Sequence, residues 1–167
     1  MQHAIQLENV YLFEAFDKDG NLKWVEEVPN TVVNEGLNDL LDKYLKGSSY
    51  TAAWYVGLIN NSGFSAIAAG DTAASHAGWT ELTGYSESVR QTLTLGSVAS
   101  QSVDNSASKA SFSINATVTI NGAFVISNST KSGTSGVLYG AASFSSPRSL
   151  VSGDTLNVTV TLTAASA

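Results

Sequence analysis

The chain of 167 residues has no cysteine, which excludes disulfide bonds, thiolate metal sites and cysteine nucleophiles. Histidine is scarce, since only His3 and His76 carry an imidazole. Charged residues make up 13% of the chain, about half of the usual share, whereas the apolar share of 43% is ordinary. This composition predicts a folded chain with a hydrophobic core and argues against intrinsic disorder.

Basic residues are also few. Eight Lys and Arg stand against fourteen Asp and Glu, which gives a formal net charge of −6, and no cluster of basic residues is present to neutralise phosphates. We therefore expect neither a nucleic-acid partner nor attachment to a membrane. No apolar run approaches the roughly 18 residues of a membrane span, and the first residues lack the pattern of a secretion signal. The length predicts one domain over 1–167.

Charge is distributed unevenly along the chain. Residues 1–90 hold seventeen of the twenty-two charged residues, and residues 91–167 hold five. The second part depends on Ser, Thr and Asn for its solubility. Because Thr favours strands and Ser and Asn favour turns, this part is expected to form many short strands.

Apolar patterns in the first sixty residues predict strands. An N-terminal arm over 1–33 contains two strands, near 10–16 and 22–28, and the Asp-Gly pair within 17–21 predicts the turn of a β-hairpin between them. Residues 52–60 form a nearly continuous apolar run, which is typical of a central strand buried on both faces.

Later in the chain, apolar residues alternate with polar ones at a period of two. This alternation predicts further strands at 93–95, 110–120, 123–126, 137–144 and 156–162. The turn-forming segments between them are 121–122, 131–136 and 152–154. We therefore expect a mainly β fold, with an antiparallel β-sandwich or jelly-roll-like domain over 52–163.

One amphipathic α-helix is predicted over 34–46. Asn34 is a favourable N-cap, Glu35 suits the positive end of the helix dipole, and Gly47 supplies a stop. Apolar residues recur at spacings of three and four at Leu37, Leu40, Leu41, Tyr44 and Leu45. We expect this apolar stripe to cover one end or face of the sheet.

A long loop over 61–81 holds most of the candidate functional residues, and loops of this length are usually functional. Asp71, Ser75 and His76 are the residue types of a Ser-His-Asp hydrolase, but the Gly-x-Ser-x-Gly turn is absent. In the alternative interpretation, His76 stacks near Trp79 and bonds a loop carbonyl. We expect no catalytic residue.

Two binding chemistries are also open for this region. Asp71, His76 and Glu81 offer carboxylate and imidazole ligands for a divalent ion, but the set is small, and we expect no metal or other cofactor. Trp79 and Tyr85 are candidate platforms for a sugar ring.

Several short strings occur in a fixed order between about Val10 and Thr163. The most distinctive runs from Asp71 to Glu81, Asp-Thr-Ala-Ala-Ser-His-Ala-Gly-Trp-Thr-Glu, followed by Tyr85 and Arg90. The others are Asn34-Glu35-Gly36-Leu37, Trp54-Tyr55-Val56-Gly57-Leu58-Ile59, Gly122-Ala123-Phe124 and Gly153-Asp154-Thr155-Leu156. In these strings and their order, the chain resembles small virion structural proteins of tailed bacteriophages.

The resemblance implies a non-enzymatic component of the phage particle, foremost a decoration or cement protein that binds the outside of the capsid and stabilises the shell. Its implied partners are the major capsid protein and copies of itself, as a homotrimer or other symmetric oligomer. Such a protein is made in the host cytoplasm and located on the virion. The interface residues that we expect are Trp79, Tyr85, His76, Asp71 and Glu81. The alternative is a tail or tail-fibre component with a receptor- or carbohydrate-binding sandwich.

Overall fold

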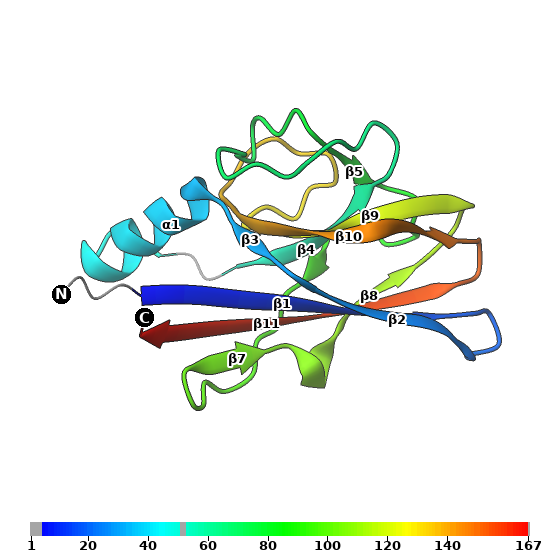
Figure 1. The fold of residues 1–167 in the computed structure, drawn as a ribbon, viewed down its shortest axis with the longest axis horizontal. Coiled ribbons are helices and arrows are strands. Elements are labelled where there is room, and N and C mark those ends of the chain that lie inside the picture. Colours follow the sequence, from blue (N-terminus) through cyan, green and yellow to red (C-terminus); the bar gives the residue numbers. More distant parts are fainter. Residues whose placement is uncertain (1–4, 51–52, 167) are drawn as a thin grey trace.

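The structure is a computed structural model that describes residues 5–50 and 53–166, and it confirms a mainly β fold. Two antiparallel sheets lie face to face as a sandwich (Figure 1). Sheet A has the strand order β2 (Leu22–Pro29), β1 (Ile5–Phe16), β11 (Thr155–Ser166) and β7 (Ser102–Asp104), with β8 (Ala110–Ser113) also paired to β11. Sheet B has the order β3 (Thr31–Val32), β10 (Leu138–Leu150), β9 (Val118–Ile126), β4 (Tyr55–Asn60) and β5 (Thr80–Leu82), with β6 (Gln91–Thr92) also paired to β4.

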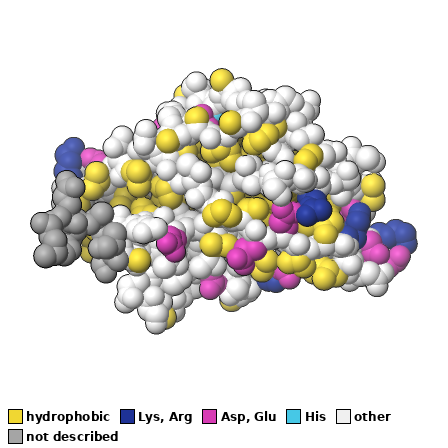
Figure 2. Space-filling model, in the orientation of Figure 1, with side chains coloured by type: hydrophobic (Ala, Val, Ile, Leu, Met, Phe, Trp, Pro, Cys, Tyr) yellow, Lys and Arg dark blue, Asp and Glu magenta, His cyan; other side chains and the backbone are white. Residues whose placement is uncertain are grey.

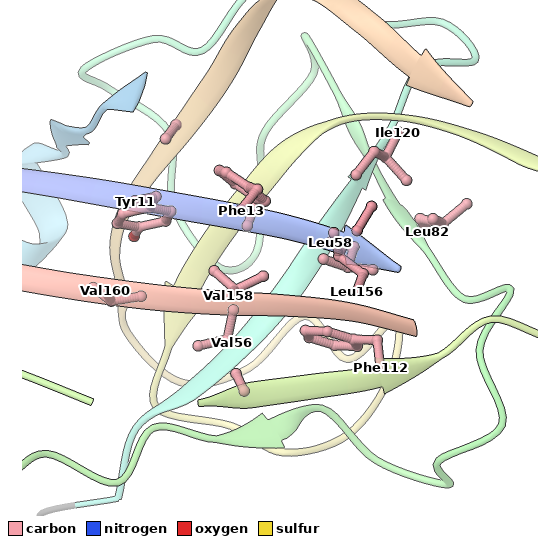
Figure 3. Packing of buried hydrophobic residues seen from close by; sticks show 14 of the residues in the cluster. Tyr11, Phe13, Val56, Leu58, Leu82, Phe112, Ile120, Leu156, Val158 and Val160 are labelled. Atoms are coloured by element: carbon pink, nitrogen blue, oxygen red, sulfur yellow. The ribbon is translucent and has the colours of Figure 1, made fainter. Parts of the chain in front are cut away.

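The main hydrophobic core lies between the two sheets. Tyr11 and Phe13 of β1 point into it from sheet A, and Val56, Leu58 and Ile120 enter it from sheet B (Figure 3). All five side chains are fully buried. Burial of this apolar surface is the dominant stabilising term for such a sandwich.

The predicted N-terminal hairpin is confirmed. Its turn is closed by the Asp17 carboxylate, which accepts hydrogen bonds from the backbone N–H groups of Asp19 and Asn21, both at 2.9 Å. Gly20 adopts a φ of +83° there, a conformation that favours glycine. Strand β1 also pairs along its whole length with β11, so the sandwich includes the strands assigned to an arm. Residues 1–4 of that arm lie outside the described residues.

The prediction of a central strand near 52–60 is confirmed for β4, while residue 52 itself lies outside the described residues. Val56 and Leu58 face the core between the sheets. Ile59 belongs to a second cluster on the outer face of sheet B, together with Trp79. The strand is covered on both faces, which explains its nearly continuous apolar sequence.

The predicted turn at 121–122 is wrong, and so is the single strand over 110–120. Residues 110–113 form β8 in sheet A, whereas β9 begins at Val118 in sheet B and continues through Gly122. The register of β9 against both neighbours shifts between Ile120 and Gly122, and the glycine has a φ of +150°. A Cβ atom here would lie 1.9 Å from the carbonyl oxygen of Ala142. The Asn-Gly pair therefore forms a bulge within a strand.

Other strand boundaries also differ from the prediction. Residues 93–95 form no strand, because the short pairing with β4 ends at Thr92. Strand β10 begins at Leu138, one residue after the predicted start, and continues to Leu150 instead of ending at 144. The structure confirms turns within 131–136 and 152–154 and adds the short strands β3, β5 and β7. Short strands give too few alternating positions to be recognised from sequence.

The helix begins at Asn34 as α1 (Asn34–Leu40) and continues as one π-helical segment, η1 (Leu41–Leu45). The predicted stop is confirmed, since Gly47 has a φ of +79°. The predicted Asn34 cap is wrong, because Val33 is the N-cap residue and makes no side-chain cap bond. Within the described residues, no helix has the length and apolar character required to cross a membrane.

The apolar stripe of the helix does not cover the sheet, contrary to the prediction. Leu41, Tyr44 and Leu45 are 53%, 83% and 71% exposed. The helix instead approaches β10 through Gly36, where a Cβ atom would lie 2.4 Å from the carbonyl oxygen of Tyr139. The side of the helix that carries Gly36 packs against the sheet, and the leucines on the other side therefore stay exposed to solvent.

Candidate functional site

The loop between β4 and β5 folds onto the outer face of sheet B (Figure 1). Trp79, at its end, is only 3% exposed and packs on Phe124 of β9 with ring centroids 5.0 Å apart. Ile59 and Ala73 belong to the same buried cluster. The loop is therefore a second hydrophobic layer anchored by one aromatic ring.

His76 makes the two contacts of the alternative to a hydrolase, a stack on Trp79 and a bond to a loop carbonyl, and that interpretation is confirmed. Its ring stacks on Trp79 with centroids 3.9 Å apart and an interplanar angle of 19°. Its Nδ1 atom lies 3.0 Å from the carbonyl oxygen of Trp79. A carbonyl oxygen only accepts, so Nδ1 carries the hydrogen. This pair of contacts holds the loop end against the Trp79 ring.

Asp71 is engaged with Trp79 and not with His76. Its Oδ2 atom accepts hydrogen bonds from Nε1 of Trp79 at 2.9 Å and from the backbone N–H of Ala68 at 3.0 Å. The backbone N–H of Ser75 donates to the Thr72 hydroxyl within a local turn. The residues of the hydrolase hypothesis thus serve separate structural contacts, and the geometry supplies no chain of hydrogen bonds from carboxylate to imidazole to hydroxyl.

Glu81 forms a buried ion pair with Arg90. The guanidinium donates to both carboxylate oxygens, from Nε at 2.9 Å and from Nη2 at 2.8 Å. Arg90 also donates to the carbonyl oxygens of Asn128 and Gly133, while the backbone N–H of Ser132 donates to Glu81. This network joins β5 to the loop between β9 and β10 and satisfies a pair of charges that would be costly to bury alone.

The candidate metal ligands are consequently not brought together. Asp71 bonds the Trp79 indole, His76 a backbone carbonyl, and Glu81 a guanidinium. Over residues 5–50 and 53–166, no group of three or more His, Asp or Glu side chains is placed to hold a metal ion. A cavity of about 250 Å³ lies among these loops, and the charged groups that line it, Glu81 and Arg90, already neutralise one another.

Tyr85 is 1% exposed and packs edge-on against Phe112 at a centroid distance of 4.9 Å. The Lys131 ammonium lies 3.6 Å from the centre of the Tyr85 ring and donates to its backbone carbonyl at 2.9 Å. Burial lowers the pKa of Lys131 and raises that of Tyr85. Neither Tyr85 nor Trp79 presents an open ring face, which corrects the expectation of surface platforms for a sugar. An interface role for Trp79, Tyr85, His76, Asp71 and Glu81 stays a prediction.

Glu35 connects the helix to these loops. Its Oε2 atom accepts hydrogen bonds from the backbone N–H groups of Ala73 at 2.9 Å and of Leu138 at 2.7 Å. The sequence suggested only a dipole role for this carboxylate. Together with the close approach of Gly36 to Tyr139, the two bonds fix where the helix leaves the sandwich.

The feature that sequence reasoning missed is the exposed apolar face of this helix. We define the apolar helix face as six exposed residues, of which five lie on the helix and Tyr50 follows it: Leu37, Leu40, Leu41, Tyr44, Leu45 and Tyr50. Hydrophobic side chains gather over the α1 end of the molecule in Figure 2. The sequence did contain an indication of this exposed face. Leu40 and Tyr44 lie on one line along the helix, and Leu37, Leu41 and Leu45 lie on a second line beside it, so the apolar part of the helix surface is wide. A single contact with the sheet cannot bury an apolar surface of this width.

A cavity of about 410 Å³ lies beside this face, between the helix and the end of the sandwich. It is lined mostly by apolar side chains, among them Leu40, Tyr44 and Trp54. The indole N–H of Trp54 donates to the Tyr50 hydroxyl at 2.9 Å, so the polar atoms of its aromatic wall are satisfied. The face and the cavity together form an apolar surface suited to contact with another polypeptide.

Comparison with known proteins adds no family assignment. No protein-family model matches the chain, and no curated protein matches it either.

Proposed function

We propose that this chain is a non-enzymatic structural protein of a tailed-bacteriophage particle. In this proposal it binds the outside of the capsid as a decoration protein and stabilises the shell. The proposal joins the resemblance of the Asp71–Glu81 string and its companions to one structural observation. That observation is the apolar helix face, a contiguous group of exposed large hydrophobic side chains of the kind that marks an interaction surface.

The charges of the second half of the chain support an interface role. Three of its five charged residues are in ion pairs with the first half: Asp154 with Lys23, Lys109 with Glu14, and Arg148 with Glu26. A fourth, Lys131, is stacked on a tyrosine ring. Hydroxyl-bearing strands with few free charges are desolvated at low cost when another protein covers them.

The internal use of the reactive side chains also supports a structural role. Asp71, His76 and Glu81 each hold one part of the loops over sheet B, as described above. The most distinctive string of the sequence therefore shapes a rigid surface. In the proposed function this surface is presented to the shell.

The mechanism that we propose is mass action. A protein that binds the assembled lattice but not its separated subunits stabilises the lattice by an amount that grows with the logarithm of its concentration over Kd. The effect adds over the many equivalent sites of a shell. No covalent chemistry is involved, and the partners are the major capsid protein and further copies of the chain.

Two measurements test the proposal. The first is the copy number in purified particles, from quantified gel bands, which we expect to be comparable to that of the major capsid protein. A handful of copies per particle would instead indicate the tail or tail-fibre alternative. The second is binding of the purified chain to undecorated capsids, which we expect to saturate and to raise the temperature at which the shells open. Absence of binding contradicts the decoration role.

A further inference from the structure

We propose that the apolar helix face is a homotypic interface. In this arrangement two copies of the chain pair their helices in antiparallel orientation about a two-fold axis that passes at Leu41. The inference deepens the proposed function, on which its role in a particle rests, by assigning a surface and a symmetry to the contact between copies.

The size of the face fits a stable dimer. At roughly 150–200 Å² for each large apolar side chain, the exposed fractions of its six residues sum to at most on the order of 600 Å², and this sum includes Leu40, Tyr44 and Tyr50, which line the neighbouring cavity. A standard protein interface buries about 800 Å² on each partner. The face therefore supplies most of such an interface, and backbone and flanking atoms supply the remainder.

The sequence of the helix is self-complementary about Leu41. In an antiparallel pair, a residue that precedes the axis by a given number of positions in one copy meets the residue that follows the axis by the same number in the other copy. Leu37 of one copy therefore meets Leu45 of the other, and Leu41 meets Leu41. These three leucines, four residues apart, form one ridge along the helix, the kind of row that packs against another helix. A two-fold contact uses this same ridge on both subunits.

Charge on the helix favours a second copy over a partner of opposite charge. Asp42 is neutralised within its own helix, since it bonds Lys46 at 3.0 Å and lies 3.2 Å from Lys43. The hydroxyl of Ser48 donates to the same carboxylate at 2.9 Å. Asp42, Lys43 and Lys46 are therefore paired within each copy. In the antiparallel register about Leu41, Asp39 of one copy lies opposite Lys43 of the other, so opposite charges face each other across the pair.

The helix is attached to the sandwich by one side. In Figure 1, α1 projects from one end of the sandwich, beside the end at which β1 begins and β11 finishes. The close approach at Gly36 and the bonds of Glu35 attach the opposite side of the helix to the sandwich. The leucine ridge is therefore held on the side of the helix away from these contacts, in a position suited to pairing.

The solution mass of the full chain, from sedimentation over a wide range of concentration, tests the interface. We expect twice 17.4 kDa for the unchanged protein. Leu41→Lys places two ammonium groups at the axis and is expected to weaken the dimer by about a hundredfold or more. The matched control is Val98→Lys, which changes an apolar residue that is 75% exposed in the segment between β6 and β7 and should leave the dimer intact. Circular dichroism verifies that both variants fold.

The absence of native cysteine provides a direct test of register. We expect Leu41→Cys alone to form a disulfide-linked dimer on mild oxidation, because a residue on a two-fold axis meets itself. Leu37→Cys and Leu45→Cys should each cross-link poorly alone and efficiently when mixed. Val98→Cys serves as the control for random collision.

A monomer at every concentration, a trimer, or a dimer that Leu41→Lys leaves intact would overturn the inference. So would equal cross-linking of Leu41→Cys and Val98→Cys. These outcomes are separate from those of the capsid assay: a monomer that binds capsids refutes only the dimer, and a dimer that binds no capsid refutes only the decoration role.

Discussion

The Glu81 carboxylate and the Arg90 guanidinium face each other in a two-point ion pair, with Nε–Oε1 and Nη2–Oε2 distances of 2.9 and 2.8 Å and side chains that are 4% and 3% exposed. The pair holds together a β-strand and two loops that are far apart in sequence. It occupies the region where the sequence indicated a binding site.

Arg90→Ala is expected to destabilise the fold by about 3–5 kcal/mol, because it leaves a buried carboxylate without its partner. Two backbone carbonyls, of Asn128 and Gly133, also lose their donors. Urea unfolding of the two proteins measures the difference. Lys18→Ala, which removes a largely exposed ion pair with Asp19, is the control and should change stability by less than about 0.5 kcal/mol. A loss below about 1 kcal/mol for Arg90→Ala contradicts the role given to this pair.

Trp79→Ala should cost more than His76→Ala, in stability and in binding to particles. The indole is a buried anchor on Phe124 and its removal leaves a cavity, at a cost of about 3–5 kcal/mol. His76 is partly exposed and contributes one stack and one hydrogen bond, for about 1 kcal/mol. Thermal unfolding and a capsid-binding assay measure the two losses. Equal losses, or a larger one for His76→Ala, would refute this order.

Gly122→Ala should destabilise the sandwich by about 2 kcal/mol or more. The new Cβ would lie 1.9 Å from a backbone carbonyl oxygen in the middle of sheet B, at a φ of +150°. Gly70→Ala is the matched control, since a Cβ there has no neighbour within 4 Å. Chemical denaturation of both variants checks the prediction, which fails if the two substitutions have similar effects.

The carboxylate of Asp42 should titrate well below its ordinary pKa. Hydrogen bonds from Lys46, Ser48 and Lys43 lower its pKa from 3.8 to about 2. A pKa that is lower in the folded chain means that the contacts stabilise the helix end above about pH 4, and that this contribution disappears as the pH falls toward 2. The carboxyl resonance of Asp42 measures the midpoint by NMR. A midpoint near 3.8 contradicts the contacts, and Asp42→Asn removes the transition for comparison.

Much of the fold was predictable because local chemistry and tertiary contacts favour the same structure. The Asp17–Asn21 turn, the apolar run of β4 and the stop at Gly47 were all found where the sequence indicated them. Asn121-Gly122 shows the opposite case. The same dipeptide suits a tight turn and a bulge, and the neighbouring strands β4 and β10 determine which one forms.

The site was less predictable than the fold. Proximity in sequence suggested that Asp71, Ser75 and His76 act together. In the structure, the Trp79 indole donates a hydrogen bond to the Asp71 carboxylate and stacks on the His76 imidazole. No pattern in the sequence indicated a role for Arg90, which belongs only to the strings that carry the resemblance to phage proteins. Its partner Glu81 is nine residues away, and no periodic pattern relates a strand to the loop that follows it.

By itself, the sequence determined that this chain forms strands, one helix and a hydrophobic core, because alternation, helical spacing and turn residues are local properties. Only the tertiary structure decided which surface remains outside. Helical spacing shows that Leu37, Leu41 and Leu45 share a face, but the direction of that face depends on Gly36 against Tyr139 and on the two bonds of Glu35, which are contacts across more than thirty residues. The leucines point to solvent because the opposite side of the helix is the one that fits the sheet.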